Sequence, residues 1–218
     1  INKIEVWVTN RQNRITTTNN NIRNIIALQD LGESRLHGVL DKEVVVIKDQ
    51  DRSKLWLNPS DLDLPTDNKN NAYDPDLIDK PNGLLRIGIR EMATVQEGFK
   101  SNQNVNEGQD YSKLENARKL NPNEFTFHPQ LGYISLQQKL ANDEVLAVAY
   151  QYTIGDQVFQ VGEFGNDGID ATVMTGSTPA TQAVITQSLI LKMLKSNLTN
   201  VNNPVWNLMM KNIYQIPG

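Results

Sequence analysis

The chain has 218 residues, of which 39% are hydrophobic and 21% are charged, and this composition is that of a folded protein rather than a disordered one. A chain of this length buries roughly 70% of the surface that its unfolded form exposes, so folding requires neither a metal nor a disulfide. The formal net charge is −4 and the basic residues are scattered, which disfavours nucleic-acid binding. Cysteine is absent, which excludes disulfides, thiolate chemistry and cysteine-ligated zinc.

The first elements in chain order are predicted to be short strands. In residues 4–10 the apolar Ile4, Val6 and Val8 alternate with Glu5, Trp7 and Thr9, which is typical of a strand with one face in the core. Trp7 lies on the other face, so we expect that face to be covered at least in part. Residues 22–31 predict a short helix or strand, and the β-branched run 44–47 predicts a buried strand.

Two long loops are predicted, and both are expected to be flexible. Residues 58–82 contain four prolines and many Asp and Asn residues, and residues 97–110 form the second predicted loop. Between the loops, the alternation in residues 85–89 predicts a strand. After them, residues 111–120 predict a short helix that has Asp110 as its N-cap and carries Leu114 and Ala117 on one side.

The C-terminal half has the strongest β signal. Residues 125–128 and 133–136 flank a turn, and residues 144–153 and 158–164 predict a hairpin joined at Gly155–Asp156. Residues 184–194 favour a strand, and Asn203–Pro204 opens a short helix. The main core is expected to contain Phe125, Phe127, Tyr133, Leu146, Val148, Tyr150 and Phe159.

These elements predict a mainly β fold class, an antiparallel β-sandwich or jelly roll with about eight strands and two or three short helices. We expect a single sandwich-like domain over residues 1–218. Because the chain begins at Ile1 without a methionine and shows no signal peptide, we also expect it to be excised from a larger protein.

No motif in the sequence predicts catalysis or a cofactor, so we expect no catalytic and no cofactor-binding residue. Histidine occurs only at His37 and His128, neither with a second ligand at metal spacing, and a structural role is favoured for His128. Gly176–Ser177 lacks a base nearby in sequence. A pair of carboxylates brought together in space, as in a glycosidase, is neither excluded nor indicated.

Two acidic segments offer the alternative of calcium binding. Residues 166–170 form one of them, and the other contains Asp61, Asp63, Asp67, Asp74, Asp76 and Asp79. Neither has the ligand spacing of a calcium loop, and Asp is common in proline-rich turns, so turn chemistry is favoured and no metal is assigned.

Residues 204–214 contain more apolar side chains than a short helix buries on one face. Trp and Met are enriched in interface cores, so this segment predicts a protein interface. Burial within the same domain stays the alternative. The predicted interface residues are Val205, Trp206, Met209, Met210 and Ile213.

Several blocks of sequence together carry a resemblance to a known family. They are residues 4–11 (IEVWVTNR), 23–33 (RNIIALQDLGE), 125–136 (FTFHPQLGYISL) and 144–152 (EVLAVAYQY), followed by 191–195 and 204–214. In this order they resemble soluble segments of the SprA/Sov family, the gliding-motility and type 9 secretion proteins of Bacteroidetes, which form a very large outer-membrane barrel.

The resemblance implies a non-catalytic soluble module of an outer-membrane translocon, on the extracellular or periplasmic side. Its partners would be other parts of the same barrel protein and components of the secretion system, with no nucleic acid and no membrane insertion of this segment. The alternative is a cell-surface carbohydrate-binding jelly-roll domain, with or without calcium.

Overall fold

A computed structural model describes residues 1–11, 21–29, 34–37, 41–44, 75–81, 85–99, 105–108, 110–166, 168–175, 183–198 and 213–214. The predicted strand at 44–47 lies outside these residues except for Val44, as does most of the predicted loop at 58–82. The predicted helix that begins at Asn203 also lies outside them.

The described residues are mainly β, which confirms the predicted fold class. The strands are β1 (Lys3–Val8), β2 (Ile22–Gln29), β3 (Ser34–His37), β4 (Asp41–Val44), β5 (Tyr111–Lys119), β6 (Phe125–His128), β7 (Tyr133–Leu136), β8 (Leu146–Ile154), β9 (Gln157–Val161), β10 (Thr172–Thr175), β11 (Ala183–Thr186) and β12 (Leu189–Lys195). Short 3-10 helices are η2 (Pro75–Leu77), η3 (Ile87–Arg90) and η4 (Val95–Gly98). None of the helices in these ranges is long and apolar enough to cross a membrane.

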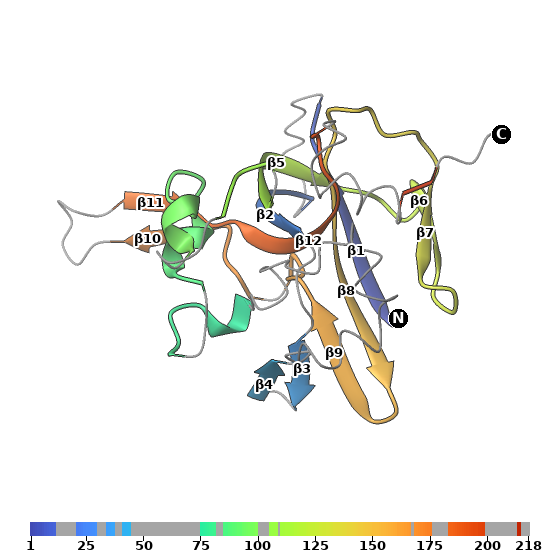
Figure 1. Ribbon diagram of the computed structural model, residues 1–218, viewed down its shortest axis with the longest axis horizontal. Helices are drawn as coiled ribbons and strands as arrows, with labels where there is room; N and C mark the ends of the chain where they lie inside the picture. Colours follow the sequence, from blue (N-terminus) through green and yellow to red (C-terminus); the bar gives the residue numbers. More distant parts are fainter. Residues whose placement is uncertain are drawn as a thin grey trace, which may run out of the picture.

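Five of the strands close into a ring. The order is β1–β5–β2–β12–β8, and β8 also pairs with the whole of β1, from Lys3 to Val8, which closes the ring. The pair β2–β12 is parallel, whereas the other pairs of the ring are antiparallel. Strands β9, β3 and β4 extend the sheet beyond β8. The result is a sandwich-like body of strands (Figure 1).

The interior of the ring is filled from every strand, because side chains alternate between the two faces of a sheet. Trp7 of β1 is completely buried and lies opposite Ala147 of β8, whose small side chain leaves room for the indole. The other buried residues of this cluster include Ile25, Ala27, Leu114, Ala117, Ala149, Leu189, Leu191 and Met193. Burial of Trp7 confirms that both faces of β1 are covered.

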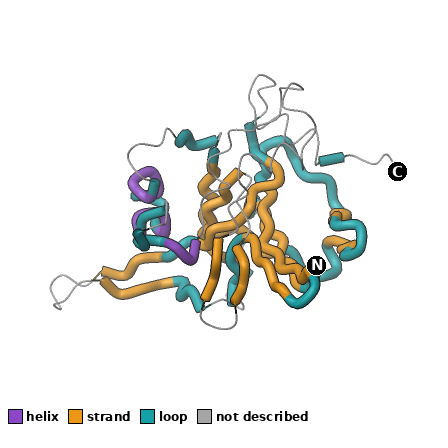
Figure 2. Tube along the Cα trace, turned by 60° about the horizontal axis from the view of Figure 1, so that its bottom comes forward, coloured by secondary structure: helices purple, strands orange, loops and turns teal. Residues whose placement is uncertain are grey.

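Two segments cover the outside of the ring. The segment 85–99, which contains η3 and η4, packs on the outward residues of β2 and β12, such as Leu28 and Ile190. The hairpin β6–β7 packs on outward residues of β1 and β8, such as Val6 and Val148. Figure 2 shows the helical cover and the hairpin on opposite sides of the strands.

Two predicted elements are wrong. Residues 111–120 form strand β5 rather than a helix, and Asp110 does not cap a helix but accepts a hydrogen bond from the backbone of Asn106. Residues 85–89 form a single β-bridge at Leu85 followed by η3, rather than a strand. The predicted strand at 184–194 is confirmed, but Gln187–Ser188 divides it into β11 and β12.

The predicted core is correct only in part. Leu146 and Val148 are buried and Phe125 and Tyr150 pack on the same outer cluster, but Tyr133 is 46% exposed. Phe127 and Phe159 are half-buried. The largest buried side chain is instead that of Trp7, inside the ring.

Candidate functional site

A two-stranded ribbon, β10–β11, projects from one side of the body (Figures 1 and 2). Met174 lies directly opposite Val184 in its register, so the two side chains share one face, and they are 64% and 67% exposed. Neither strand contains a charged residue. The ribbon therefore presents an exposed, apolar and uncharged pair on one face.

The base of this ribbon is held by two arginines from other parts of the chain. Arg23 of β2 donates a hydrogen bond to the carbonyl of Ile169, three residues before β10, at 3.0 Å. Arg90 of η3 donates to the carbonyl of Ser188, just after β11, at 3.1 Å, and the backbone N–H of Ser188 donates to the Arg90 carbonyl at 2.8 Å. A two-stranded ribbon is marginally stable alone, so these bonds fix where it projects.

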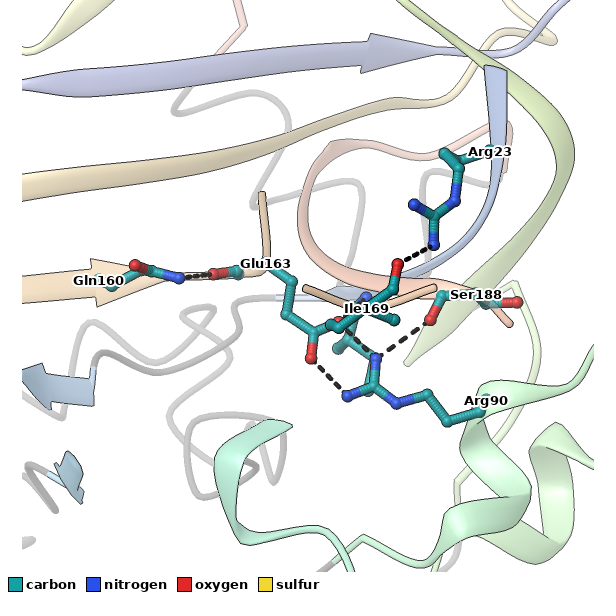
Figure 3. A network of polar contacts seen from close by, with 8 residues as sticks. Arg23, Arg90, Gln160, Glu163, Ile169 and Ser188 are labelled. Atoms are coloured by element: carbon teal, nitrogen blue, oxygen red, sulfur yellow. Dashed lines mark hydrogen bonds and ion pairs between the residues drawn. The ribbon is translucent and has the colours of Figure 1, made fainter. Parts of the chain in front are cut away.

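Arg90 is itself fixed by a buried ion pair with Glu163 (Figure 3). Its two terminal nitrogens donate to the two carboxylate oxygens, each at 2.5 Å, and the side chains are only 11% and 7% exposed. The backbone N–H of Ile190 in β12 donates to the same carboxylate at 2.8 Å. The pair thus ties the cover segment 85–99 to the end of β9 and the start of β12.

Burial governs the electrostatics of this cluster. It raises the pKa of the Glu163 carboxyl, against the hydrogen bonds and positive charge of Arg90 that act to lower it. Burial likewise lowers the pKa of the Arg23 guanidinium, against the attraction of Glu163. The Nε of Arg23 and the Oγ of Ser188 are buried without a hydrogen-bond partner among the described residues. Such orphaned groups cost about 1–3 kcal/mol each, so the cluster positions the ribbon at some expense of stability.

A second buried carboxylate, Glu5 of β1, lies at the ring interior. It accepts hydrogen bonds from the Trp7 indole at 3.3 Å, from the Gly165 backbone N–H at 3.0 Å and from the Lys119 ammonium at 3.2 Å. The indole N–H in the core is thereby satisfied. Glu5 and Glu163 are both used in holding segments together.

The interface residues predicted from sequence are mostly outside the described ranges. This holds for Val205, Trp206, Met209 and Met210. Ile213 is described: it is half-buried and packs on the outer cluster formed by β1 and β8. The structure therefore places one of the five beside the body and leaves the other four as a prediction.

The candidate metal ligands are scattered in the described part of the chain. His128 stacks on Tyr133 with ring centroids 4.3 Å apart, as befits a structural histidine, and His37 belongs to β3. Asp76 lies in η2, and the Asp79 carboxylate is 4.0 Å from Arg86. Asp61, Asp63, Asp67, Asp74 and Gly176–Ser177 lie outside the described residues. Within them, no three potential ligands gather.

Sequence reasoning missed Arg23, Arg90 and Glu163. Two of these positions carry a weak signal, since Arg23 stands two residues before the apolar run that begins at Ile25, and Glu163 stands between Gly162 and Phe164 in an apolar stretch. A charged residue in such a place is buried only when it is paired. No local pattern says which partner it has.

A family model described as a motility related/secretion protein, SprA_N, matches residues 1–156. The chain belongs to the SprA family. The resemblance drawn from the sequence blocks is confirmed. The SprA match contains four of the five ring strands and ends in the turn between β8 and β9, so the ribbon and β12 lie beyond it. No curated protein matches the chain.

Proposed function

We propose that this chain is a non-catalytic soluble module of an outer-membrane translocon that serves type 9 secretion and gliding motility. It acts by packing against protein surfaces: other parts of the same barrel protein and components of the secretion system. It lies on the extracellular or periplasmic side without entering the membrane. Membership of a motility and secretion family supports the setting.

The observation that carries the packing role is the ribbon β10–β11. It exposes Met174 and Val184 on one face, has no charge in either strand, and is anchored at its base by Arg23 and Arg90. A preorganised apolar surface loses little conformational freedom when it binds, which favours association. The buried carboxylates Glu5 and Glu163 support a non-catalytic role, because each is engaged by a basic side chain and a backbone N–H.

The secretion assay tests this role with charge placed on the ribbon. Met174→Lys and Val184→Lys are made in the full-length protein, and Leu131→Lys, at a residue that is 75% exposed on the β6–β7 hairpin, is the matched control. Substitutions at exposed sites change stability by less than about 0.5 kcal/mol, so melting stays unchanged in all three. We expect loss of secretion and gliding in the ribbon variants alone. Normal secretion by both would refute the packing role of the ribbon.

The segment 204–214 is a second contact surface under the same proposal. Trp206→Ala and Met210→Ala are melted in the isolated chain and scored for assembly and secretion in the full-length protein. Small stability losses with a large loss of assembly support an interface. A loss of several kcal/mol, the scale of a vacated core site, places these residues in the core instead.

One observation favours carbohydrate binding as a second candidate function. Tyr150, Tyr152 and Phe159 stack in a row on β8 and β9, with ring centroids 6.1 Å and 5.2 Å apart. Aromatic rows bind sugars when their faces are open, whereas these three side chains are half-buried. A glycan array separates the candidates, since specific glycan binding that Tyr152→Ala abolishes would favour the second.

A further inference from the structure

The ribbon β10–β11 has an outer edge whose hydrogen-bonding pattern follows from its register. The N–H of Gln187 donates to the carbonyl of Ala171 at 2.8 Å, in line with the pairs Val173–Ile185 and Thr175–Ala183. Hydrogen-bonded and non-bonded pairs alternate in an antiparallel ladder. Val173 and Thr175 therefore bond to β11, whereas Thr172 and Met174 turn their N–H and C=O groups away from it.

Within the described ranges, β10 pairs only with β11. Its outer edge thus presents two N–H and two C=O groups at the spacing of a strand. Thr172 and Met174 are both exposed at this edge. Another extended backbone carries donors and acceptors at the same spacing. The ligand that matches this edge is therefore an extended peptide segment.

This edge lacks the features that protect the edges of β-sheets. Natural edge strands carry charges, prolines or bulges, or are covered, because an open edge pairs with other chains. The sequence of β4, the end strand of the larger described sheet, by contrast contains Asp41, Lys42 and Glu43. Strand β10, with the sequence TVMT, contains no charge and no proline. Among the described residues, the outer edge of β10 therefore has none of these protections.

We propose that β10 is a docking edge to which an extended, uncharged segment of a partner protein adds as a third strand. This inference rests on the packing role proposed above and names its chemistry. The backbone groups of Thr172 and Met174 supply the hydrogen bonds, and a side chain of the partner covers the exposed Met174. A partner segment is favoured over a second copy of the chain because each copy has a net charge of −4, which opposes self-association.

The buried arginines explain why the ribbon can serve as a template. Strand addition requires the template to stay extended, and an isolated ribbon is marginally stable. Arg23 and Arg90 hold the residues at its two ends, Ile169 and Ser188, so the edge is ordered before the partner arrives.

Amide hydrogen exchange in the 218-residue chain tests the docking edge. The probe is the capped peptide Ala-Val-Ile-Thr-Gln-Ser, the sequence of residues 183–188, which already pairs with the inner edge of β10. In the free chain, we expect fast exchange at Thr172 and Met174 and slower exchange at Val173. With the peptide at ten times its dissociation constant, exchange at Thr172 and Met174 slows about tenfold, whereas Val173 changes little.

Two variants and a modified peptide serve as controls. Met174→Pro removes an outward N–H without breaking the ladder to β11, so it abolishes the slowing at Thr172. Met174→Thr keeps that N–H and retains the slowing. A peptide whose alternate amides are N-methylated cannot donate hydrogen bonds from one edge, so we expect it not to slow exchange at Thr172 and Met174. The N-methylated peptide is used with the unmodified chain, so it still tests the docking edge if the proline variant fails to fold.

Three outcomes would overturn the proposal. In the first, exchange at Thr172 and Met174 stays fast up to the solubility limit of the peptide. In the second, the N-methylated peptide protects as well as the parent. In the third, these amides are already protected in a dimer seen by sedimentation, so that a second copy occupies the edge. None of these measurements involves secretion. The proposed function is therefore tested independently by the lysine variants in the secretion assay.

Discussion

Removal of Arg90 tests whether the buried ion pair holds the cover segment and the ribbon in place. Arg90→Met keeps much of the side-chain volume but leaves the Glu163 carboxylate, 7% exposed, with only the Ile190 N–H as a donor in the described contacts. Breaking a buried pair by removing one partner costs about 3–5 kcal/mol. In a chain of this size each kcal/mol lowers the melting temperature by about 2–4 °C. Urea unfolding followed by circular dichroism measures the loss.

An exposed ion pair provides the matched control. Arg118 donates to both carboxylate oxygens of Glu124 at 2.7 Å, but these side chains are 38% and 30% exposed. Arg118→Met therefore costs less than about 1 kcal/mol. If the two variants lose the same free energy, burial does not decide the strength of the Arg90 pair and the reasoning is wrong. The double variant Arg90→Met/Glu163→Met recovers much of the loss, because no buried charge is left unpaired.

The stability of the single variant Arg90→Met is expected to depend on pH. Burial raises the pKa of Glu163 above its usual value of 4.5, so the folded chain holds a proton that the unfolded chain releases. This contribution to stability is complete below 4.5 and is lost as the pH rises through the raised pKa. Without Arg90 the pKa rises further, since its attraction no longer opposes burial. Arg90→Met is therefore less destabilising at about pH 5 than at about pH 8, and an equal loss at both would contradict this account.

Three further predictions concern packing and a second carboxylate. Gly98→Ala is expected to cost more than about 2 kcal/mol in urea unfolding, because its Cβ would lie 2.3 Å from the backbone nitrogen of Ile89. Trp7→Ala costs about 3–5 kcal/mol, whereas Tyr133→Ala, at an exposed site, stays near neutral, and a reversed order would contradict the core assignment. Burial acts to raise the pKa of Glu124, but hydrogen bonds from Asn121 and Arg118 outweigh it and lower the pKa. Its contribution is present above 4.5 and is lost as the pH falls through the lowered pKa, so Glu124→Gln flattens the acid side of a stability–pH curve.

Strand prediction from sequence succeeded where the alternation was regular. The residues of β1 and β8 switch faces at every step, so the period of two is visible without knowing the partners. The hairpin β8–β9 was also predictable, because Gly155 adopts φ 62° in the turn and the turn joins neighbours in sequence. Both features depend on residues that are close together in the sequence.

The helix predicted at 111–120 failed because of a bulge. The register between β2 and β5 shifts between Arg23 and Ile25, which pair with Ala117 and Leu114, and Asn116 has φ 50°. The extra residue turns Leu114 and Ala117 to the same face although they are three apart. Three-residue spacing is also the signature of a helix, so the sequence could not distinguish the two.

The strand predicted at 85–89 failed because this segment bonds to itself. Its backbone groups are satisfied by Arg86 with Gly98 and by Ile89 with Arg86, and the missing side chain of Gly98 lets the chain double back against Ile89. Leu85 and Ile89 are buried, whereas Ile87, which alternation places on the same face, is 58% exposed. Gly98, which makes the contact that bends the segment, lies 13 residues after Leu85.

The sequence by itself determined the β-rich class, the alternating strands, the local hairpin and the family resemblance, because each depends on neighbouring residues or on whole blocks of sequence. The tertiary structure decided the closure of the ring, in which β1 pairs with strands that begin 108 and 143 positions after Lys3. It also decided the pairing of Arg90 with Glu163, 73 residues apart, and the position of β10, which among the described residues pairs with β11 alone. Pairings at such separations depend on which surfaces meet after the chain has collapsed, and no local pattern in the residues carries that information.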